Sequence, residues 1–193
     1  QLGFFGPVED KKIKLLLAFL AGQEKDTKEI KTILEEFSGT QVFYKAIAKK
    51  NGIDNPFDPR VIEAYWLGNY LLDQFKGHAH HSYPVYHIYR ADCLGGGLQF
   101  NDRLRDTCRI IWGQVKKIGR YRLIIEYQPI IRENSQLKFG PRQNVSVKWN
   151  KKILSEKIKI GSWVSAHWGC AIQILSKTQR SNLAKYTLAN LNK

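Results

Sequence analysis

The chain has 193 residues, of which 43% are hydrophobic and 25% charged, and this composition is that of a folded globular protein rather than a disordered one. One large domain or two small ones are expected, and no apolar run reaches the roughly 18–20 residues that a membrane-spanning helix needs. Three cysteines do not suggest a disulfide framework, so a cytoplasmic location is expected, while the net charge of +14 would attract nucleic acid, anionic lipid or an acidic partner protein.

Hydrophobic residues at helical spacing predict four helices in the first part of the chain, over residues 9–21, 27–37, 40–50 and 59–75. Asp58 before Pro59 favours a helix start, because the first helical turn tolerates a residue that lacks an N–H. Gly22 and Gly52 favour helix ends. We predict that residues 1–76 form a small helical bundle.

The segment 77–107 is expected to connect this bundle to the rest of the chain, and it is rich in histidine. Its histidines are His78, His80, His81 and His87. On a strand, His78 and His80 would share a face, and clustered imidazoles can bind a transition metal. The alternatives are a structural role in hydrogen bonding, which the lack of a defined ligand spacing favours, and a pH switch. The run Gly95–Gly97 lacks the spacing of a phosphate-binding loop, so no nucleotide is predicted.

Short strands with turns between them predict a small OB-like β-barrel over residues 108–193. The expected strands cover residues 108–117, 123–128, 145–149, 163–167 and 171–175. Ser176 can cap a final helix that carries Leu183, Tyr186, Thr187 and Leu191 on one side. The predicted class is therefore α+β, with a helical bundle, a histidine-rich link and a barrel that ends in a helix.

Cys108 is the residue on which the functional interpretation depends. A cysteine where the first strand begins is either a small buried hydrophobic residue or a ligand or nucleophile displayed at the end of a rigid element. Gly113, inside the same strand, indicates a bulge or the close approach of another backbone. Cys93 and Cys170 are expected to be packing residues.

Two motifs stand out in residues 108–193. The first is Cys108, four residues, Gly113, Gln114 and Val115. The second comprises Gly161, Trp163, Val164, His167, Gly169, Ala171, Ile172 and Leu175. Together they resemble the motifs of the small HypC/HupF-type [NiFe]-hydrogenase maturation chaperones. The whole chain also resembles a prokaryotic domain-of-unknown-function family, through Leu2–Gly3, Asp58–Asn69, His80–Ser82 and Cys108–Gly113.

The resemblance to the chaperones implies a non-catalytic maturation or assembly factor. In that family the cysteine holds an iron precursor together with a partner maturation protein, and it later contacts the hydrogenase large subunit. Carried over, Cys108 would be the thiolate ligand of iron, His167 would support it, and the partner would be a metalloenzyme subunit or another maturation protein. The family cysteine lies beside a free α-amine, whereas Cys108 is mid-chain and has none.

Two further functions stay open from the sequence. A basic barrel can bind nucleic acid through exposed rings such as Tyr121, Tyr127, Trp149 and Trp168, although packing in the core accounts for them better. The basic pairs, such as Lys116–Lys117, are dispersed and suit solvated faces. A thiol-dependent or metal-dependent enzyme would pair Cys108 with a histidine, with Glu63 or Asp92 as an orienting group.

Overall fold

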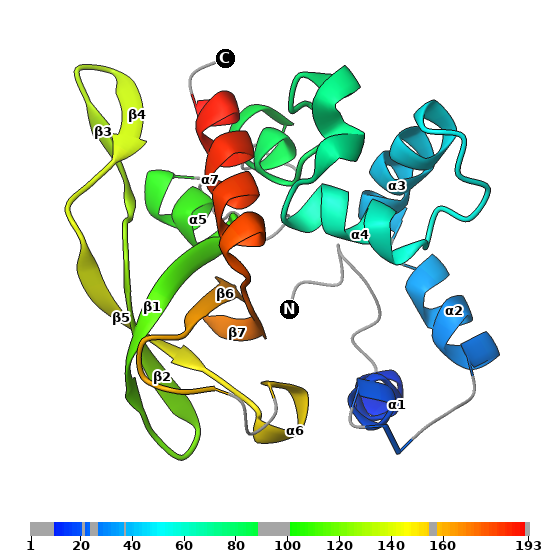
Figure 1. Cartoon of the computed structure of the whole chain (residues 1–193), viewed down its shortest axis with the longest axis horizontal. Coiled ribbons are helices and arrows are strands. Elements are labelled where there is room, and N and C mark those ends of the chain that lie inside the picture. The colour runs from blue at the N-terminus through cyan, green and yellow to red at the C-terminus, as the bar shows by residue number, and fades with distance from the viewer. Residues whose placement is uncertain are drawn as a thin grey trace.

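The computed structural model describes residues 10–20, 22–23, 27–36, 38–88, 101–154 and 158–191. Helices of the first half lie beside a closed barrel formed by the second half, and the C-terminal helix lies between them (Figure 1). The predicted α+β class, with a barrel and a terminal helix, is confirmed at this level.

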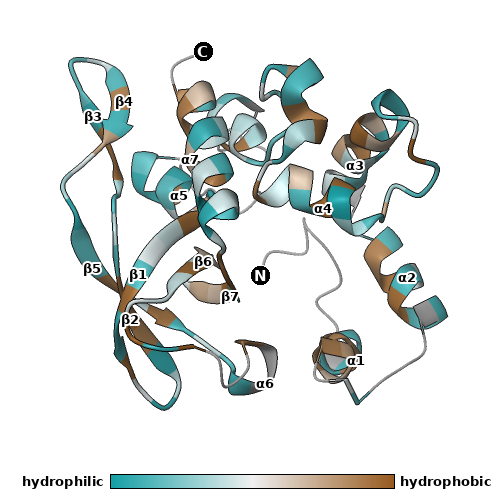
Figure 2. Cartoon of the chain, in the orientation of Figure 1, coloured by the Kyte–Doolittle hydropathy of each residue, from teal (hydrophilic) through white to brown (hydrophobic). Residues whose placement is uncertain are grey.

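Four α-helices come first in the described chain: α1 (Asp10–Leu20), α2 (Thr27–Glu35), α3 (Ser38–Lys50) and α4 (Pro59–Trp66). The helices α3 and α4 share a core around Ile47, Val61 and Tyr65, each of which is fully buried. Figure 2 shows hydrophobic and hydrophilic residues alternating around α3, as expected for a helix with one buried face.

The predicted helix over residues 59–75 is wrong in its second half. Asp58 caps α4 by accepting the Arg60 N–H at 2.8 Å, but α4 ends at Trp66. Gly68 then adopts φ +83°, and Asn69 caps a separate 3-10 helix, η1 (Tyr70–Phe75). The apolar periodicity continues across this break because α4 and η1 bury Ala64, Leu71 and Leu72 in the same core.

The histidine-rich link is not a strand. Residues 76–81 form turns, and a single π-helical turn, η2 (Pro84–Ile88), follows. The shared face that His78 and His80 would have on a strand is therefore not formed, and His80 is buried while His78 is exposed. Residues 89–100, which include the glycine run, Asp92 and Cys93, lie outside the described residues.

Cys108 closes a helix instead of opening a strand. The residues before it form helix α5 (Asp102–Cys108), and Asn101 caps its N-terminus by accepting the Leu104 N–H at 3.0 Å. Strand β1 (Ile111–Ile118) begins three residues after Cys108. The cysteine is thus fixed by the end of a helix and the start of a strand.

The barrel closes in the strand order β1-β2-β5-β7-β6. After β1 its strands are β2 (Arg122–Tyr127), β5 (Gln143–Lys148), β6 (Trp163–His167) and β7 (Cys170–Ile174), and a short helix, α6 (Lys151–Leu154), lies between β5 and β6. All pairs are antiparallel except β5–β7. Gly113 marks a close approach, as predicted, because a Cβ there would lie 2.8 Å from the Glu126 carbonyl oxygen.

A separate hairpin, β3 (Ile130–Glu133) and β4 (Gln136–Phe139), is inserted between β2 and β5. Its turn is Asn134–Ser135, and both residues have positive φ, as the tight turns of hairpins require.

The terminal helix α7 (Lys177–Leu191) joins the two halves of the molecule (Figure 1). Ser176 caps it as predicted, since its Oγ accepts the Gln179 N–H and Gln179 Oε1 accepts the Ser176 N–H. The predicted apolar side is confirmed by the burial of Leu183, Tyr186, Thr187 and Leu191. Tyr186 joins the core of α3 and α4, while Leu183 packs with Ile110 and Leu175 of the barrel half.

Candidate metal centre

Three side chains from different segments converge where the link, α5 and the barrel meet. His81, Cys108 and His167 each offer one ligand atom, and these atoms lie within 4.8 Å of one another. Ligand atoms around a tetrahedral ion lie about 3.5 Å apart, given bond lengths of about 2.0–2.3 Å. Small side-chain rotations would therefore bring these three onto one ion.

Each of the three is held by a different local structure. Cys108 ends α5 and is only 1% exposed. His167 ends β6, just before the tight turn Trp168–Gly169, in which both residues have positive φ. The turn is held against α5, because the Trp168 N–H donates to the Thr107 carbonyl at 3.2 Å.

His81 comes from the link and is 2% exposed. Its Nε2 lies 3.0 Å from the Cys108 carbonyl oxygen, and its Nδ1 lies 3.0 Å from the Tyr65 hydroxyl. A carbonyl only accepts, so Nε2 carries the proton and Nδ1 accepts from the Tyr65 hydroxyl. The His81 N–H donates to the Tyr65 carbonyl at 2.8 Å, so the backbone of the link is also fixed on α4.

Burial keeps all three groups uncharged. It raises the pKa of the Cys108 thiol to about 12 and lowers the pKa of His167 to about 4. It also lowers the pKa of His81 well below its usual range. Two neutral imidazoles suit a metal, and an ion would displace the thiol proton. A buried thiol of this kind is not an activated nucleophile, so the geometry favours a ligand over an enzyme nucleophile.

Aromatic rings surround the cluster. The ring of Trp66 lies 4.6 Å from that of His81 and 5.5 Å from that of His167, and the two histidine rings are 5.2 Å apart and nearly perpendicular. Trp168 packs beside Cys108 and Val85. The Nε2 atom of His167 is buried without a hydrogen-bond partner among the described residues. An unsatisfied buried nitrogen beside a thiol fits a metal ligand.

The other predicted histidine ligands lie elsewhere. His78 is exposed and stacks on Tyr83, and the His87 Nε2–H donates to the Asn190 carbonyl at 2.7 Å. His80 is buried, with Nδ1 2.8 Å from the Ser82 hydroxyl, and its ring stacks on that of Tyr186. Of the four histidines in the link, the structure brings only His81 to Cys108 and His167.

Burial of His80 predicts a loss of stability in acid. Its pKa is lowered by burial to about 3, against about 6.5 in an unfolded chain, so only the unfolded state takes a proton between these values. The free energy of unfolding should therefore fall as the pH drops below 6.5, with about 2 kcal/mol from His80 between pH 7 and pH 5.

Urea unfolding of the metal-free protein at pH 7 and pH 5 measures this effect. In His80→Gln the drop between the two pH values should be about 2 kcal/mol smaller than in the wild type. His78→Gln, at an exposed position, should keep the wild-type drop. Equal drops in all three proteins would contradict the prediction.

A buried ion pair beside Cys108 was not predicted from the sequence. The Arg109 Nε donates to the Asp106 carboxylate at 2.8 Å, and that carboxylate also accepts from the Tyr127 hydroxyl and the Ile130 N–H. The Arg109 Nη2 donates to the Gln128 carbonyl at 2.7 Å. A separation of three residues, as between Asp106 and Arg109, is only a weak signal for an ion pair, and it does not tell whether the pair is buried.

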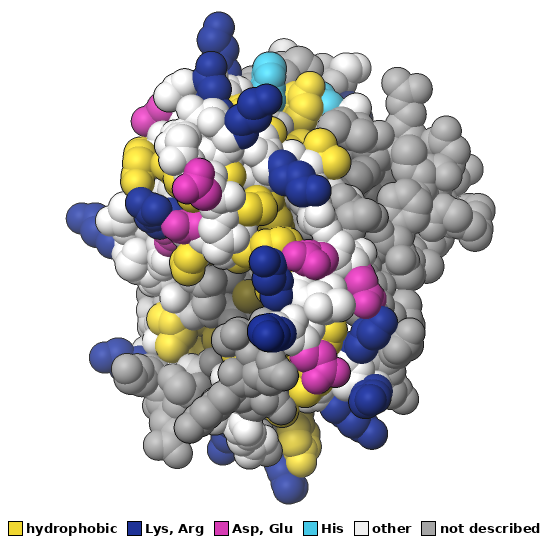
Figure 3. Space-filling model, turned by 90° about the vertical axis from the view of Figure 1, so that its right-hand side faces the viewer, with side chains coloured by type: hydrophobic (Ala, Val, Ile, Leu, Met, Phe, Trp, Pro, Cys, Tyr) yellow, Lys and Arg dark blue, Asp and Glu magenta, His cyan; other side chains and the backbone are white. Residues whose placement is uncertain are grey.

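The rings proposed for nucleic-acid binding do not form an exposed face. Tyr127 is buried and Trp149 packs against the barrel core, while only Tyr121 is largely exposed. The core-packing interpretation of these rings is therefore favoured. On the helical face of the molecule, Lys and Arg side chains are scattered among Asp and Glu (Figure 3). This agrees with solvated faces rather than a continuous phosphate track.

Other candidate residues have separate environments. Glu63 accepts a hydrogen bond from Gln179 of α7 at 2.6 Å, in a pocket of about 470 Å³ between η1 and α7. Cys170 was expected to be a packing residue, but it is exposed.

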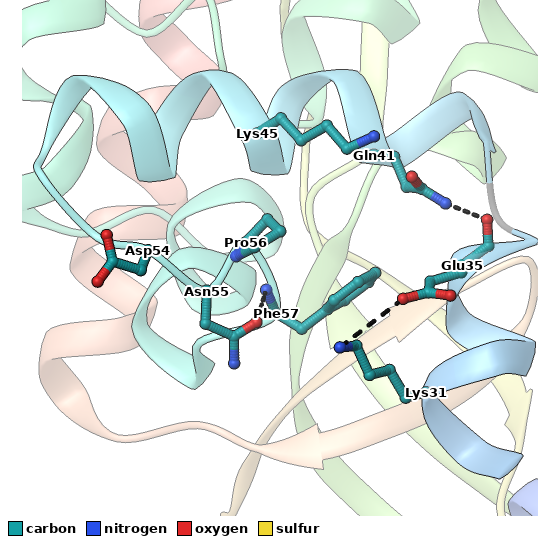
Figure 4. Close-up of a pocket in the computed structure, with 8 residues that line it drawn as sticks. All are labelled: Lys31, Glu35, Gln41, Lys45, Asp54, Asn55, Pro56 and Phe57. Atoms are coloured by element: carbon teal, nitrogen blue, oxygen red, sulfur yellow. Dashed lines mark hydrogen bonds and ion pairs between the residues drawn. The ribbon is translucent and has the colours of Figure 1, made fainter. Parts of the chain in front are cut away.

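A second pocket, of about 590 Å³, lies between α2 and the segment 54–57, and Figure 4 shows Lys31 and Gln41 both directed to Glu35 there. Neither pocket is lined by the three clustered residues.

Within the described residues, no helix has the length and apolar character needed to cross a membrane.

A model of one protein family, described as a family of unknown function, matches residues 1–79 and 75–193, which together span the chain. No curated protein and no solved structure matches the chain significantly. The predicted membership of a domain-of-unknown-function family is thus confirmed, while the likeness to hydrogenase maturation chaperones stays a prediction.

Proposed function

The chain belongs to DUF6390, a family of unknown function, and we propose that it is a non-catalytic maturation or assembly factor that binds iron through Cys108 and His167 for a metalloenzyme subunit. The observation that carries this proposal is the convergence of Cys108, His167 and His81 on one buried point. A thiolate and imidazoles together suit a transition metal such as iron.

The position of the cluster supports transfer rather than catalysis. His167 lies beside the tip of the β6–β7 hairpin and is partly exposed, whereas His81 and Cys108 are buried. Metal bound there would be shielded by Trp66 and Trp168 and reached at the hairpin. The order of the barrel strands and the parallel β5–β7 pair support the OB-like barrel that the proposal assumes.

Metal analysis with X-ray absorption on anaerobically purified protein tests the proposal. The wild type should contain stoichiometric iron with a sulfur ligand. Cys108→Ala should lose the metal and His167→Ala should lose most of it, because each change removes one ligand of a site that has few. Cys170→Ala is the matched control, since it removes an exposed thiol outside the cluster, and it should keep the iron.

Two results would overturn the proposal. Iron or zinc that persists in Cys108→Ala would place the metal at other residues. A wild type that binds no metal after anaerobic purification and iron loading would leave a barrel that binds protein or nucleic acid, and a salt titration of oligonucleotide binding would then follow.

A further inference from the structure

Both ring nitrogens of His81 are hydrogen-bonded. Nε2–H donates to the carbonyl of Cys108, the residue that also supplies the thiol, while Nδ1 accepts from Tyr65. The Tyr65 hydroxyl lies at a fully buried position, and its ring packs edge-on against His81 at 5.3 Å. The Nε2 side of the His81 ring therefore already points to Cys108, and the buried Tyr65 holds the opposite side of the ring.

Metal-binding histidines almost always donate their other ring N–H to an outer partner, which fixes the tautomer and the ring orientation. A tyrosine hydroxyl can donate or accept, so the same partner serves both tautomers of the imidazole. In the Cys108–His167 pair only two ligands are present, and Cys108 has no α-amine beside it. A third ligand from the chain has to be supplied by another residue.

Resting on the proposed function, we propose that His81 is the third ligand of this site and that Tyr65 is its positioning residue. On metal binding, the single imidazole proton moves from Nε2 to Nδ1. The Nε2 lone pair then faces the ion in place of the Cys108 carbonyl, and the Nδ1–H donates to the Tyr65 hydroxyl. The number of protons on His81 does not change.

The ion would then connect parts of the chain that are distant in sequence. Tyr65 belongs to α4, His81 to the link, Cys108 to α5 and His167 to the barrel. Trp66, next to Tyr65, already contacts both histidine rings. Helix α4 thus contributes to the outer shell of the site through these two residues.

Titration with Co²⁺ under anaerobic conditions tests this inference, because a thiolate ligand gives a charge-transfer band and the d–d bands report the ligand number. Tyr65→Phe should keep the thiolate band and the 1:1 stoichiometry but weaken Co²⁺ binding about 10–100-fold, as loss of an outer-shell partner does. His81→Gln should weaken binding further and change the d–d bands.

Matched controls separate positioning from general destabilisation. Tyr44→Phe removes a buried hydroxyl from the ring that packs against Tyr65, and His80→Gln removes the buried imidazole next to His81 in the sequence. Both should leave the affinity within about 3-fold of the wild type, since neither group touches the ligand cluster. In ¹⁵N spectra of the imidazoles, His81 should be protonated on Nε2 in the metal-free protein and on Nδ1 with Zn²⁺ bound.

The outcomes distinguish this inference from the proposed function. Wild-type affinity in both Tyr65→Phe and His81→Gln, with the thiolate band still lost in Cys108→Ala, would overturn the inference and leave the iron site at Cys108 and His167. Equal weakening by Tyr65→Phe and Tyr44→Phe would show a structural effect only. If the wild type binds no Co²⁺ or iron, both proposals fall.

Discussion

Replacing Arg109 with methionine is expected to lower the free energy of unfolding by about 3–5 kcal/mol. The guanidinium is 1% exposed and is held by the Asp106 carboxylate and the Gln128 carbonyl. It also lies 5.3 Å from the ring of Trp112 and 5.4 Å from that of Phe139. Methionine keeps most of the volume, so the loss comes mainly from leaving the Asp106 carboxylate buried without its cation.

Urea unfolding monitored by fluorescence measures this change. Arg142→Ala is the control, because Arg142 is an exposed partner of Glu126 and its loss should barely move the midpoint. Asp106 also holds the Ile130 N–H and the Tyr127 hydroxyl, so the double variant Arg109→Met with Asp106→Asn should recover part of the loss. A midpoint for Arg109→Met as close to the wild type as that of Arg142→Ala would refute the expectation.

The second large effect is expected for Gly68→Ala, with a loss of about 2–5 kcal/mol. Gly68 has φ +83°, which costs a residue with a Cβ about 1–2 kcal/mol. The new Cβ would also lie 2.1 Å from Cδ2 of Tyr186, so α7 would have to shift, and overpacking of this kind costs about 1–3 kcal/mol. Tyr186 donates its hydroxyl to the Asn69 carbonyl at 2.9 Å, which ties the ring to this turn.

Gly52→Ala separates the two causes. Gly52 has a similar φ of +64°, but a Cβ there would meet nothing within 4 Å, so only the backbone cost of about 1–2 kcal/mol is expected. Denaturant unfolding of both variants gives the difference, which is the cost of displacing Tyr186. If the two variants lose the same stability, α7 does not depend on the close contact at Gly68.

Structural features that depend only on residues close together in the sequence were predicted well. The N-cap at Asp58, the cap at Ser176 and the buried side of α7 are examples. Strand β6 has the predicted bounds. These features depend on backbone dihedrals and hydrogen bonds within a few residues, so the sequence is informative.

One error was local, because the helix predicted over 59–75 stops at Trp66, where Gly68 adopts a left-handed φ and donates its N–H to the Glu63 carbonyl. Other errors arose where distant contacts decide local structure. The polar run before Cys108 forms α5, whose Asp106 is stabilised by partners in β2, β3 and the segment after α5. The conformation of the histidine-rich link was not predicted, because hydrogen bonds to α4 and α7 fix it.

The sequence by itself determined the helical first part, the barrel strands, the terminal helix and the two residues Cys108 and His167 as candidates for a ligand pair. It offered all four histidines of the link as candidate ligands beside a structural role, without ranking one histidine above another. Only the tertiary structure decided that His81 joins the pair and that His80 and His87 bond to other groups instead. The physical reason is that a metal site depends on where chain segments far apart in sequence are brought together, and burial on packing sets the protonation of each group.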